Sequence, residues 1–199
     1  MCGIVGYSGD FQSTALELAI KRIEHRGPAD SGIYTSSDRL VGLGHTRLSI
    51  IDLSPLGHQP MMADDGLVAL VFNGEIYNFR ELRIDLEQKG HKFAGSSDTE
   101  VLLQLYLSEG EAMLKRLNGI FAFAVWDSRI GSLFLARDAL GVKPVYYVRS
   151  ERGFVFASEI KALVALSPFD GEIDIEALER YLTYLWCPGN GTPAASIKK

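Results

Sequence analysis

The order of apolar and polar positions predicts short strands mixed with amphipathic helices. Residues 3–8 form a compact apolar run that is expected to be a buried strand. Thr14 and Glu17 fit a capping box at the start of a helix. The apolar residues that follow have the spacing of one helix face: Leu16, Ala19, Ile20 and Ile23. Glycine and proline in residues 25–32 predict a loop after this helix.

The middle of the chain predicts one strand and two helices. Residues 67–72 are continuously apolar, and the Asn73-Gly74 pair behind them is typical of a tight turn. Asn78 and Glu81 have the spacing of a capped helix that runs to about Lys89 and ends at Gly90. Residues 97–99 are expected to cap a further helix, whose apolar residues are Val101, Leu102 and Leu105.

The last third predicts strands first and a helix afterwards. Four short apolar runs, separated by turn residues, suggest an antiparallel meander: 119–126, 132–136, 144–148 and 154–157. Asp174 is expected to begin a last helix with an apolar face. The composition then becomes linker-like, so we expect a domain over residues 1–186 and the start of a linker over 187–199. The mixed order of elements favours the α+β class.

Composition narrows the functional classes. The chain has 199 residues, of which 47% are hydrophobic, and a formal net charge of -5. These values argue against disorder and against an extended nucleic-acid-binding face. Two cysteines are too few for a disulfide scaffold, and no apolar run is long enough to span a bilayer. Without a recognisable signal peptide, we expect a soluble cytoplasmic protein with no membrane partner.

Cys2 is the residue whose position most clearly suggests a catalytic role. Initiator methionine is generally removed when the next residue is small, and its removal would give Cys2 a free α-amine beside its own thiol. The amine has an ordinary pKa of about 7.7–8.0, so it could serve as the base for the thiol. This combination is the arrangement of an N-terminal nucleophile. For Cys2 taken alone, a small buried hydrophobic residue at the start of a strand is the favoured interpretation.

Other polar residues could complete a site around such a nucleophile. The Asn73 side-chain amide and the Gly74 N–H could stabilise a developing oxyanion, although for the dipeptide alone a hairpin turn is the better interpretation. Arg47 suits an α-carboxylate, and Glu75 and Asp98 suit an α-ammonium. Taken singly, each of these three is better explained as a solvated charge, a surface ion pair or, for Asp98, a helix cap. The four histidines have no metal-ligand spacing, so no metal site is predicted.

Several sequence blocks occur together in a characteristic order. They are residues 1–6 (MCGIVG), 26–32 (RGPADSG), 45–52 (HTRLSIID), 57–61 (GHQPM), 72–78 (FNGEIYN), 97–101 (SDTEV), 119–124 (GIFAFA), 137–144 (RDALGVKP) and 157–159 (ASE). With these blocks the whole chain resembles the N-terminal glutaminase domain of class II glutamine amidotransferases. Phe72 before Asn73-Gly74, and the sequence EIYN behind it, favour the asparagine synthetase group of that family.

The resemblance implies a fold, a reaction and a set of roles. The fold would be the four-layer αββα sandwich of N-terminal nucleophile (Ntn) hydrolases, with two mostly antiparallel sheets. Cys2 would attack the side-chain amide of glutamine, its α-amine would relay the proton, and Asn73 with Gly74 would form the oxyanion hole. The substrate-binding residues would be Arg47, Leu48, Ile50, Asn73, Gly74, Glu75 and Asp98. Ammonia and glutamate would be the products.

The resemblance also implies which partners this domain has. No cofactor is expected for glutamine hydrolysis, whereas ATP and magnesium would belong to a synthetase domain that makes asparagine from aspartate. The Ser-Gly-Gly-x-Asp-Ser loop of that domain does not occur in these residues. Acceptors other than aspartate, a non-catalytic docking module and a homodimer remain open alternatives. The α-amine can act only if Met1 is removed.

Overall fold

The protein has two antiparallel sheets packed face to face in the computed structural model, which describes residues 1–48, 55–168 and 170–199. The first sheet has the order β2-β3-β1-β9-β8, and its strands are β1 (Gly3–Gly9), β2 (Asp30–Thr35), β3 (Val41–Arg47), β8 (Tyr146–Ser150) and β9 (Gly153–Ala157). The second has the order β4-β5-β6-β7, and its strands are β4 (Met61–Met62), β5 (Val68–Ile76), β6 (Gly119–Asp127) and β7 (Ser132–Arg137).

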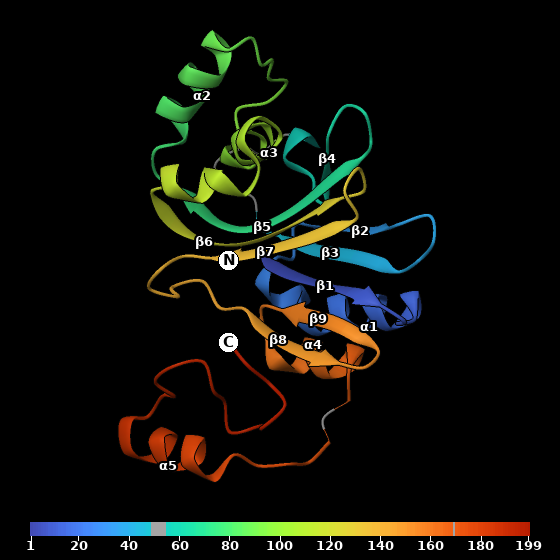
Figure 1. The fold of residues 1–199 in the computed structure, drawn as a ribbon, viewed down its shortest axis with the longest axis vertical. Helices are drawn as coiled ribbons and strands as arrows, with labels where there is room; N and C mark the ends of the chain where they lie inside the picture. The colour runs from blue at the N-terminus through green and yellow to red at the C-terminus, as the bar shows by residue number, and fades with distance from the viewer. Residues whose placement is uncertain (49–54, 169) are drawn as a thin grey trace.

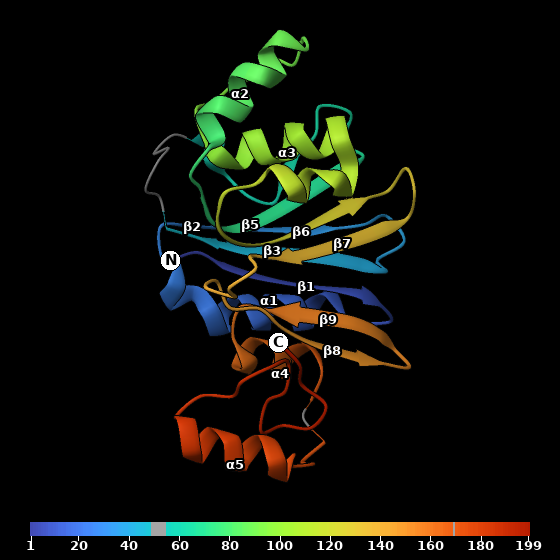
Figure 2. The ribbon, with the colours of Figure 1, turned by 60° about the vertical axis from the view of Figure 1, so that its left-hand side comes forward.

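Helices cover the outer face of each sheet (Figure 1). Helices α1 (Ser13–Ile23) and α4 (Ile160–Leu166) pack on the first sheet, and α2 (Phe79–Gln88) and α3 (Asp98–Glu109) lie over the second. Short 3-10 helices follow or connect them: η1 (Glu24–Arg26), η2 (Pro55–Gly57) and η3 (Gly110–Arg116). Figure 2 shows the layers from a second direction. The α+β class and the four-layer αββα sandwich are therefore confirmed.

Three apolar clusters correspond to the three contacts between these layers. One lies between α1, α4 and the first sheet, and another lies between the second sheet and α2 and α3. The cluster between the sheets is built largely of small or branched side chains from both: Ile4, Leu43, Ala69, Val71, Ala122, Ala124, Val145 and Phe156. Small residues allow the sheets to pack closely, which fixes the strand ends that meet at the sandwich edge.

Several predicted elements are confirmed, although two predicted caps are not. The apolar face of α1 is buried as expected, but α1 begins at Ser13, before Thr14, and has no side-chain cap. Helix α3 begins as predicted, and the Ser97 side chain accepts a hydrogen bond from the Glu100 N–H. Helix α2 is also confirmed. Asn78 does not cap it, however, because its side chain binds the Arg116 carbonyl and the Asn118 N–H.

Three sequence interpretations are wrong. Asn73-Gly74 is no turn, because β5 continues to Ile76 and pairs with β6 throughout. The four late strands are no single meander, since β6 and β7 belong to one sheet and β8 and β9 to the other. The expected loop over 25–32 contains η1 and the start of β2. In each case the pairing of strands distant in the sequence determines the structure, and local turn propensity does not predict that pairing.

The pattern of apolar residues also did not predict strand β3. Its residues Gly42 and Gly44 have low strand propensity, but they are needed for close packing. A Cβ atom on Gly42 would lie 2.3 Å from Tyr7 Cε1, and one on Gly44 would lie 2.6 Å from Ile20 Cδ1. The strand therefore uses glycine where neighbouring side chains cover it. Arg47, at the end of this strand, reaches the sandwich edge by this route.

The C-terminal segment lies beside the sandwich and is tied to it. Helix α5 (Ile175–Tyr184) begins as predicted, and Asp174 accepts a hydrogen bond from the Ala177 N–H. Its apolar residues are largely exposed, with Leu182 at 68% and Leu185, just behind the helix, at 82%. Ile197 is buried in the apolar cluster between the first sheet and helices α1 and α4, and Tyr147 and Lys198 form a β-bridge. The proposed domain boundary at residue 186 stays a prediction.

None of the helices within the described ranges is long and apolar enough to cross a membrane.

Candidate active site

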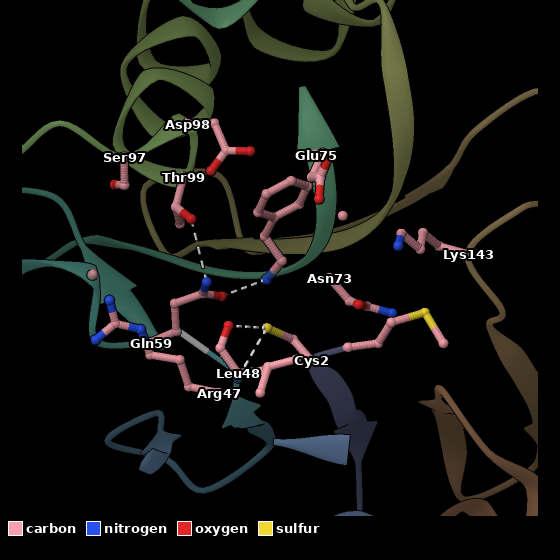
Figure 3. A pocket seen from close by; sticks show the side chains of 14 residues that line it. Cys2, Arg47, Leu48, Gln59, Asn73, Glu75, Ser97, Asp98, Thr99 and Lys143 are labelled. Carbon is pink, nitrogen blue, oxygen red and sulfur yellow. Dashed lines mark hydrogen bonds between the residues drawn. The ribbon is translucent and has the colours of Figure 1, made fainter. Parts of the chain in front are cut away.

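The described candidate residues gather in one pocket at an edge of the sandwich (Figure 3). The pocket brings together the N-terminus, the end of β3, the second half of β5 and the start of α3. Its lining includes Cys2, Arg47, Leu48, Asn73, Gly74, Glu75 and Asp98. Ile50, which was also predicted to line the substrate site, lies outside the described residues. Segments far apart in the sequence therefore meet where a nucleophile was predicted.

Cys2 is held in the pocket by hydrogen bonds at both its main chain and its thiol. The Arg26 Nε donates to the Cys2 carbonyl at 2.9 Å, and Arg26 Nη1 is paired with Glu159 at 2.9 Å. The Cys2 Sγ lies 3.4 Å from the Leu48 N–H, which donates to it. The thiol in turn donates to the Leu48 carbonyl at 3.7 Å, so the backbone of Leu48 holds the sulfur through both its N–H and its carbonyl. The β1 and β3 pairing behind Cys2 fixes its position relative to Arg47.

Asn73 presents a buried amide group that has no partner of its own. The residue is only 1% exposed, and its Nδ2 forms no hydrogen bond within the described part of the chain. An unpaired buried donor costs about 1–3 kcal/mol, so a persistent one is a candidate for ligand binding. Asn73 lies on β5 and lines the same pocket as Cys2. Its amide is therefore available for a negative oxygen near the thiol.

The Gly74 N–H lies on the edge of β5 that faces the pocket. N–H groups two residues apart in a strand point to the same edge. The neighbouring N–H of Phe72 donates to Gln59 Oε1 at 2.6 Å, and that of Ile76 donates to Asp98 Oδ2 at 3.1 Å. Side chains therefore occupy the positions before and after Gly74. The Gly74 N–H points between them and supplies a second donor beside Asn73.

Gln59 forms a wall of the pocket that sequence reasoning did not assign. Besides accepting from Phe72, its amide donates to the Thr99 hydroxyl at 3.3 Å. It thus joins β5 to the first turn of α3 while remaining buried itself. Gln59 stood within one of the quoted sequence blocks, which was the available signal. Its role is to hold the two elements that carry Asn73 and Asp98.

Arg47 brings a buried positive charge to the other side of the pocket. Its guanidinium packs against Gly57, where an added Cβ atom would lie only 2.0 Å from Arg47 Nη2. Gly57 is therefore the residue that leaves room for this cation. A planar guanidinium with this restricted placement suits a bidentate carboxylate. Leu48, which follows it, donates the hydrogen bond to Cys2 described above.

Two acidic residues, Glu75 on β5 and Asp98 on α3, line the pocket. Asp98 is buried, and burial raises its pKa to about 6, with the negative charge of Glu75 contributing in the same direction. Its hydrogen bonds to backbone N–H groups act against that shift. A carboxylate that is costly to ionise alone gains most when a cation binds beside it. Glu75 and Asp98 together therefore favour a cationic group of a ligand.

His45 lies beneath the site and connects the two sheets. It is fully buried on β3, and its Nε2 lies 3.2 Å from the Phe72 carbonyl on β5. Burial lowers its pKa to about 3, so the ring is neutral and the Nε2–H donates to that carbonyl. His45 thus fixes β3 against β5 next to Asn73. Sequence reasoning had given it only a structural role, and these contacts agree with that.

The arrangement is matched to a small molecule that has both charges. Arg47 lies on one side, the carboxylates lie on another, and a thiol with two free donors lies between them (Figure 3). An amino acid fixed by its α-carboxylate and α-ammonium would direct its side chain toward the thiol. In the parts of the chain that the structure describes, no group of three His, Cys, Asp or Glu side chains is placed to hold a metal ion.

Comparison with known proteins agrees with this description. The family described as "Glutamine amidotransferase domain" matches residues 1–199. Asparagine synthetase [glutamine-hydrolyzing] 1 of Bacillus subtilis is 42% identical over all of this chain, which covers 32% of that protein. Amidase chry2 of Gibberella zeae is 38% identical over 83% of this chain and 26% of its own length. The chain thus spans about a third of the length of such relatives.

A solved structure shows the same fold at lower sequence identity. It is a glutamine phosphoribosylpyrophosphate amidotransferase of B. subtilis in complex with ADP and GMP, with a TM-score of 0.71 and 23% identity. The match covers 82% of this chain and 43% of that one. At this identity the likeness concerns the fold alone. Together with the family match and the 42% identical relative, it completes the assignment: the chain belongs to the glutamine amidotransferase domain family, in the group related to glutamine-hydrolysing asparagine synthetases.

Proposed function

We propose that this domain hydrolyses glutamine to glutamate and ammonia, with Cys2 as an N-terminal nucleophile. The observation that carries the proposal is the pairing of the Cys2 thiol with the unpartnered Asn73 amide in one pocket. The side-chain amide of a substrate bound there would have its carbonyl carbon near the thiol and its oxygen near Asn73 Nδ2 and the Gly74 N–H. Arg47, Glu75 and Asp98 supply the charges that an α-amino acid needs.

The steps follow from these positions. The Cys2 sulfur attacks the side-chain carbonyl carbon of glutamine, while its α-amine takes up the thiol proton. Asn73 Nδ2 and the Gly74 N–H stabilise the oxygen of the tetrahedral intermediate. The C–N bond then breaks, the relayed proton goes to the nitrogen, and ammonia leaves. Water attacks the remaining γ-glutamyl thioester, which releases glutamate and restores the thiol.

Removal of Met1 is required by this mechanism. While Met1 is attached, the nitrogen of Cys2 is an amide and cannot accept the proton. Met1 also lines the same pocket, so it takes up space beside the proposed substrate. Its loss would create the base and open the site in one event. Intact mass spectrometry of the purified protein reports directly whether the chain begins at Met1 or Cys2.

A comparison of the processed wild type with Cys2→Ala tests the proposal. The wild type should release glutamate from glutamine, and Cys2→Ala should release none above the uncatalysed rate. Cys2→Ser is the matched control for size, since it keeps the α-amine and replaces only the sulfur. Glutamate release by Cys2→Ala at the wild-type rate would refute the proposal. Absence of turnover in a processed, folded wild type would favour the non-catalytic docking module.

We also propose that the ammonia serves ATP-dependent asparagine formation from aspartate in the full-length protein. Support comes from relatives named glutamine-hydrolysing asparagine synthetases, of which this chain covers about a third. ATP and magnesium would bind in the additional domain. The exposed apolar side chains of the segment around Leu182 and Leu185 fit coverage by such a domain. The full-length protein should form asparagine from aspartate, glutamine and Mg-ATP.

A different carboxylate acceptor is the second candidate. The relative named amidase chry2 shows that similar domains occur in proteins that are not named asparagine synthetases. This domain binds only the nitrogen donor in our proposal, so its residues do not select the acceptor. Full-length protein that consumes glutamine and ATP without forming asparagine would favour this candidate. Whether the protein forms a homodimer remains a separate prediction.

A further inference from the structure

Lys143 is a buried lysine whose ammonium is unpartnered. It is 8% exposed, and within the described residues its ammonium forms no hydrogen bond or ion pair. The buried carboxylates Asp98, Asp127 and Asp138 all accept hydrogen bonds. A lysine that lines the pocket of a proposed nucleophile without a counterion is a candidate for function. Sequence reasoning assigned Lys143 no role.

The chain holds Lys143 in place through its backbone. The Lys143 N–H donates to Asp138 Oδ2 at 3.0 Å, and Arg137 Nε donates to the Lys143 carbonyl at 2.9 Å. Asp138 also accepts from the N–H groups of Val142 and Phe121. None of these contacts uses the lysine side chain. Substitution of Lys143 therefore leaves the loop held as before.

The side chain enters the pocket from the side opposite Arg47. Figure 3 shows Lys143 and Arg47 on opposite sides, with Cys2 and Asn73 between them. Arg47 and the two carboxylates are the groups suited to the charged end of an amino acid. Lys143 lies beyond Cys2 and Asn73 as seen from Arg47 (Figure 3). Its charge therefore acts on the nucleophile more than on the ligand's α-carboxylate.

We propose that Lys143 is a positioning charge for catalysis, whose ammonium activates Cys2. A neighbouring positive charge disfavours the protonated α-amine, and it favours both a thiolate and the oxyanion of the tetrahedral intermediate. All three effects increase the reactive form at neutral pH. The proposal rests on the proposed function, because it assigns the charge to the same nucleophile. The other charged groups near Cys2 are Arg26, which donates to the Cys2 carbonyl and is paired with Glu159, and the pocket residues Arg47, Glu75 and Asp98.

Neutral and charge-conserving variants of the processed protein test this role. The measurements are kcat/KM for glutamine and the rate of Cys2 alkylation by iodoacetamide, located by peptide mass, between pH 5.5 and 9. In Lys143→Met, the pH at which each of the two rates rises from its low acid value should move up by about 0.5–1 pH unit. At pH 6.5 both rates should fall about 3- to 10-fold, and near pH 9 they should approach the wild type.

Three further variants serve as controls. Lys143→Gln should repeat the shift, whereas Lys143→Arg should keep the wild-type profile within about twofold because it keeps the charge. Lys115→Met changes the net charge equally at an exposed residue of η3, outside the pocket, and should leave both profiles unchanged. Asp98 titrates in a similar range, and loss of a nearby cation would also raise its pKa. The alkylation profile separates the two effects, because iodoacetamide reacts with Cys2 without glutamine bound by Asp98.

Two results would overturn the inference. Unshifted profiles in both neutral variants would show that the charge does not act on Cys2. A raised KM with unshifted profiles would place Lys143 on the substrate carboxylate instead. Failure of the proposed function would look different, since the wild type itself would release no glutamate while its alkylation profile could still be measured.

Discussion

The raised pKa of Asp98 predicts that glutamine binding weakens in mild acid. The α-ammonium of glutamine stays charged from pH 7 to pH 5, but the carboxylate proposed to hold it does not. With a pKa of about 6, Asp98 is about 90% ionised at pH 7 and about 10% ionised at pH 5. The association constant should therefore fall about tenfold, or by about 1.4 kcal/mol. Calorimetric titration of Cys2→Ala with glutamine measures this without turnover.

Asp98→Asn separates the binding role from a structural one. The asparagine keeps an oxygen that can accept from the Ile76 N–H, so the start of α3 should persist. At pH 7 the variant should bind glutamine at least about tenfold more weakly, since it loses a charged hydrogen-bond partner. Its affinity should no longer change between pH 7 and pH 5. Wild-type affinity that is constant across this range would refute the reasoning, as would the same pH dependence in Asp98→Asn.

The same carboxyl group should affect stability with the opposite sign. Its folded pKa lies above the ordinary value of 3.8, so the folded state holds more protons between pH 3.8 and 6. This group therefore lowers the free energy of unfolding as pH rises through that window. Asp98→Asn should be more stable than the wild type at pH 7, although it binds more weakly. Thermal unfolding at pH 5 and pH 7 measures the difference.

Three other predictions follow from the site. Asn73→Ala should lower kcat by about 100- to 1,000-fold with little change in KM, because it removes an oxyanion donor; an unchanged kcat would contradict this. Gly57→Ala should raise KM for glutamine at least about tenfold, because its Cβ displaces the Arg47 guanidinium, whereas Gly66→Ala, outside the pocket, should not. In the folded protein His45 stays neutral down to about pH 3, whereas in the unfolded chain it gains a proton below about pH 6.5. As the pH is lowered between these values, the free energy of unfolding should therefore decrease by up to about 1.4 kcal/mol per pH unit. In urea unfolding, His45→Asn should lose this component, and an identical slope would refute it.

Periodicity predicted the elements whose own residues carry the signal. The apolar face of α1 and the Ser97 cap of α3 are local features, and both could be read from spacing. Strand β3 could not, because Gly42 and Gly44 fit the fold through neighbours distant in the sequence. The Asn73-Gly74 pair illustrates the same limit. Its turn preference was real, but pairing with β6 kept it extended.

The site was predicted from motif order more than from chemistry. Taken singly, Arg47, Glu75 and Asp98 had simpler interpretations, and only the resemblance combined them. Gln59 and Lys143 were missed because their importance lies in contacts that spacing does not encode: a bridge from β5 to α3 and a charge without a partner. Roles for all of these residues remain predictions that the experiments above address.

The most direct test of the central claim is to observe the covalent intermediate on Cys2. The processed protein, mixed with glutamine and quenched in acid within milliseconds to seconds, would be digested and analysed by mass spectrometry. The account predicts a γ-glutamyl adduct on the N-terminal peptide that begins with Cys2, which disappears as glutamate accumulates, and no adduct in Cys2→Ala. Steady glutamate release with no adduct at Cys2, or with one on another residue, would contradict it.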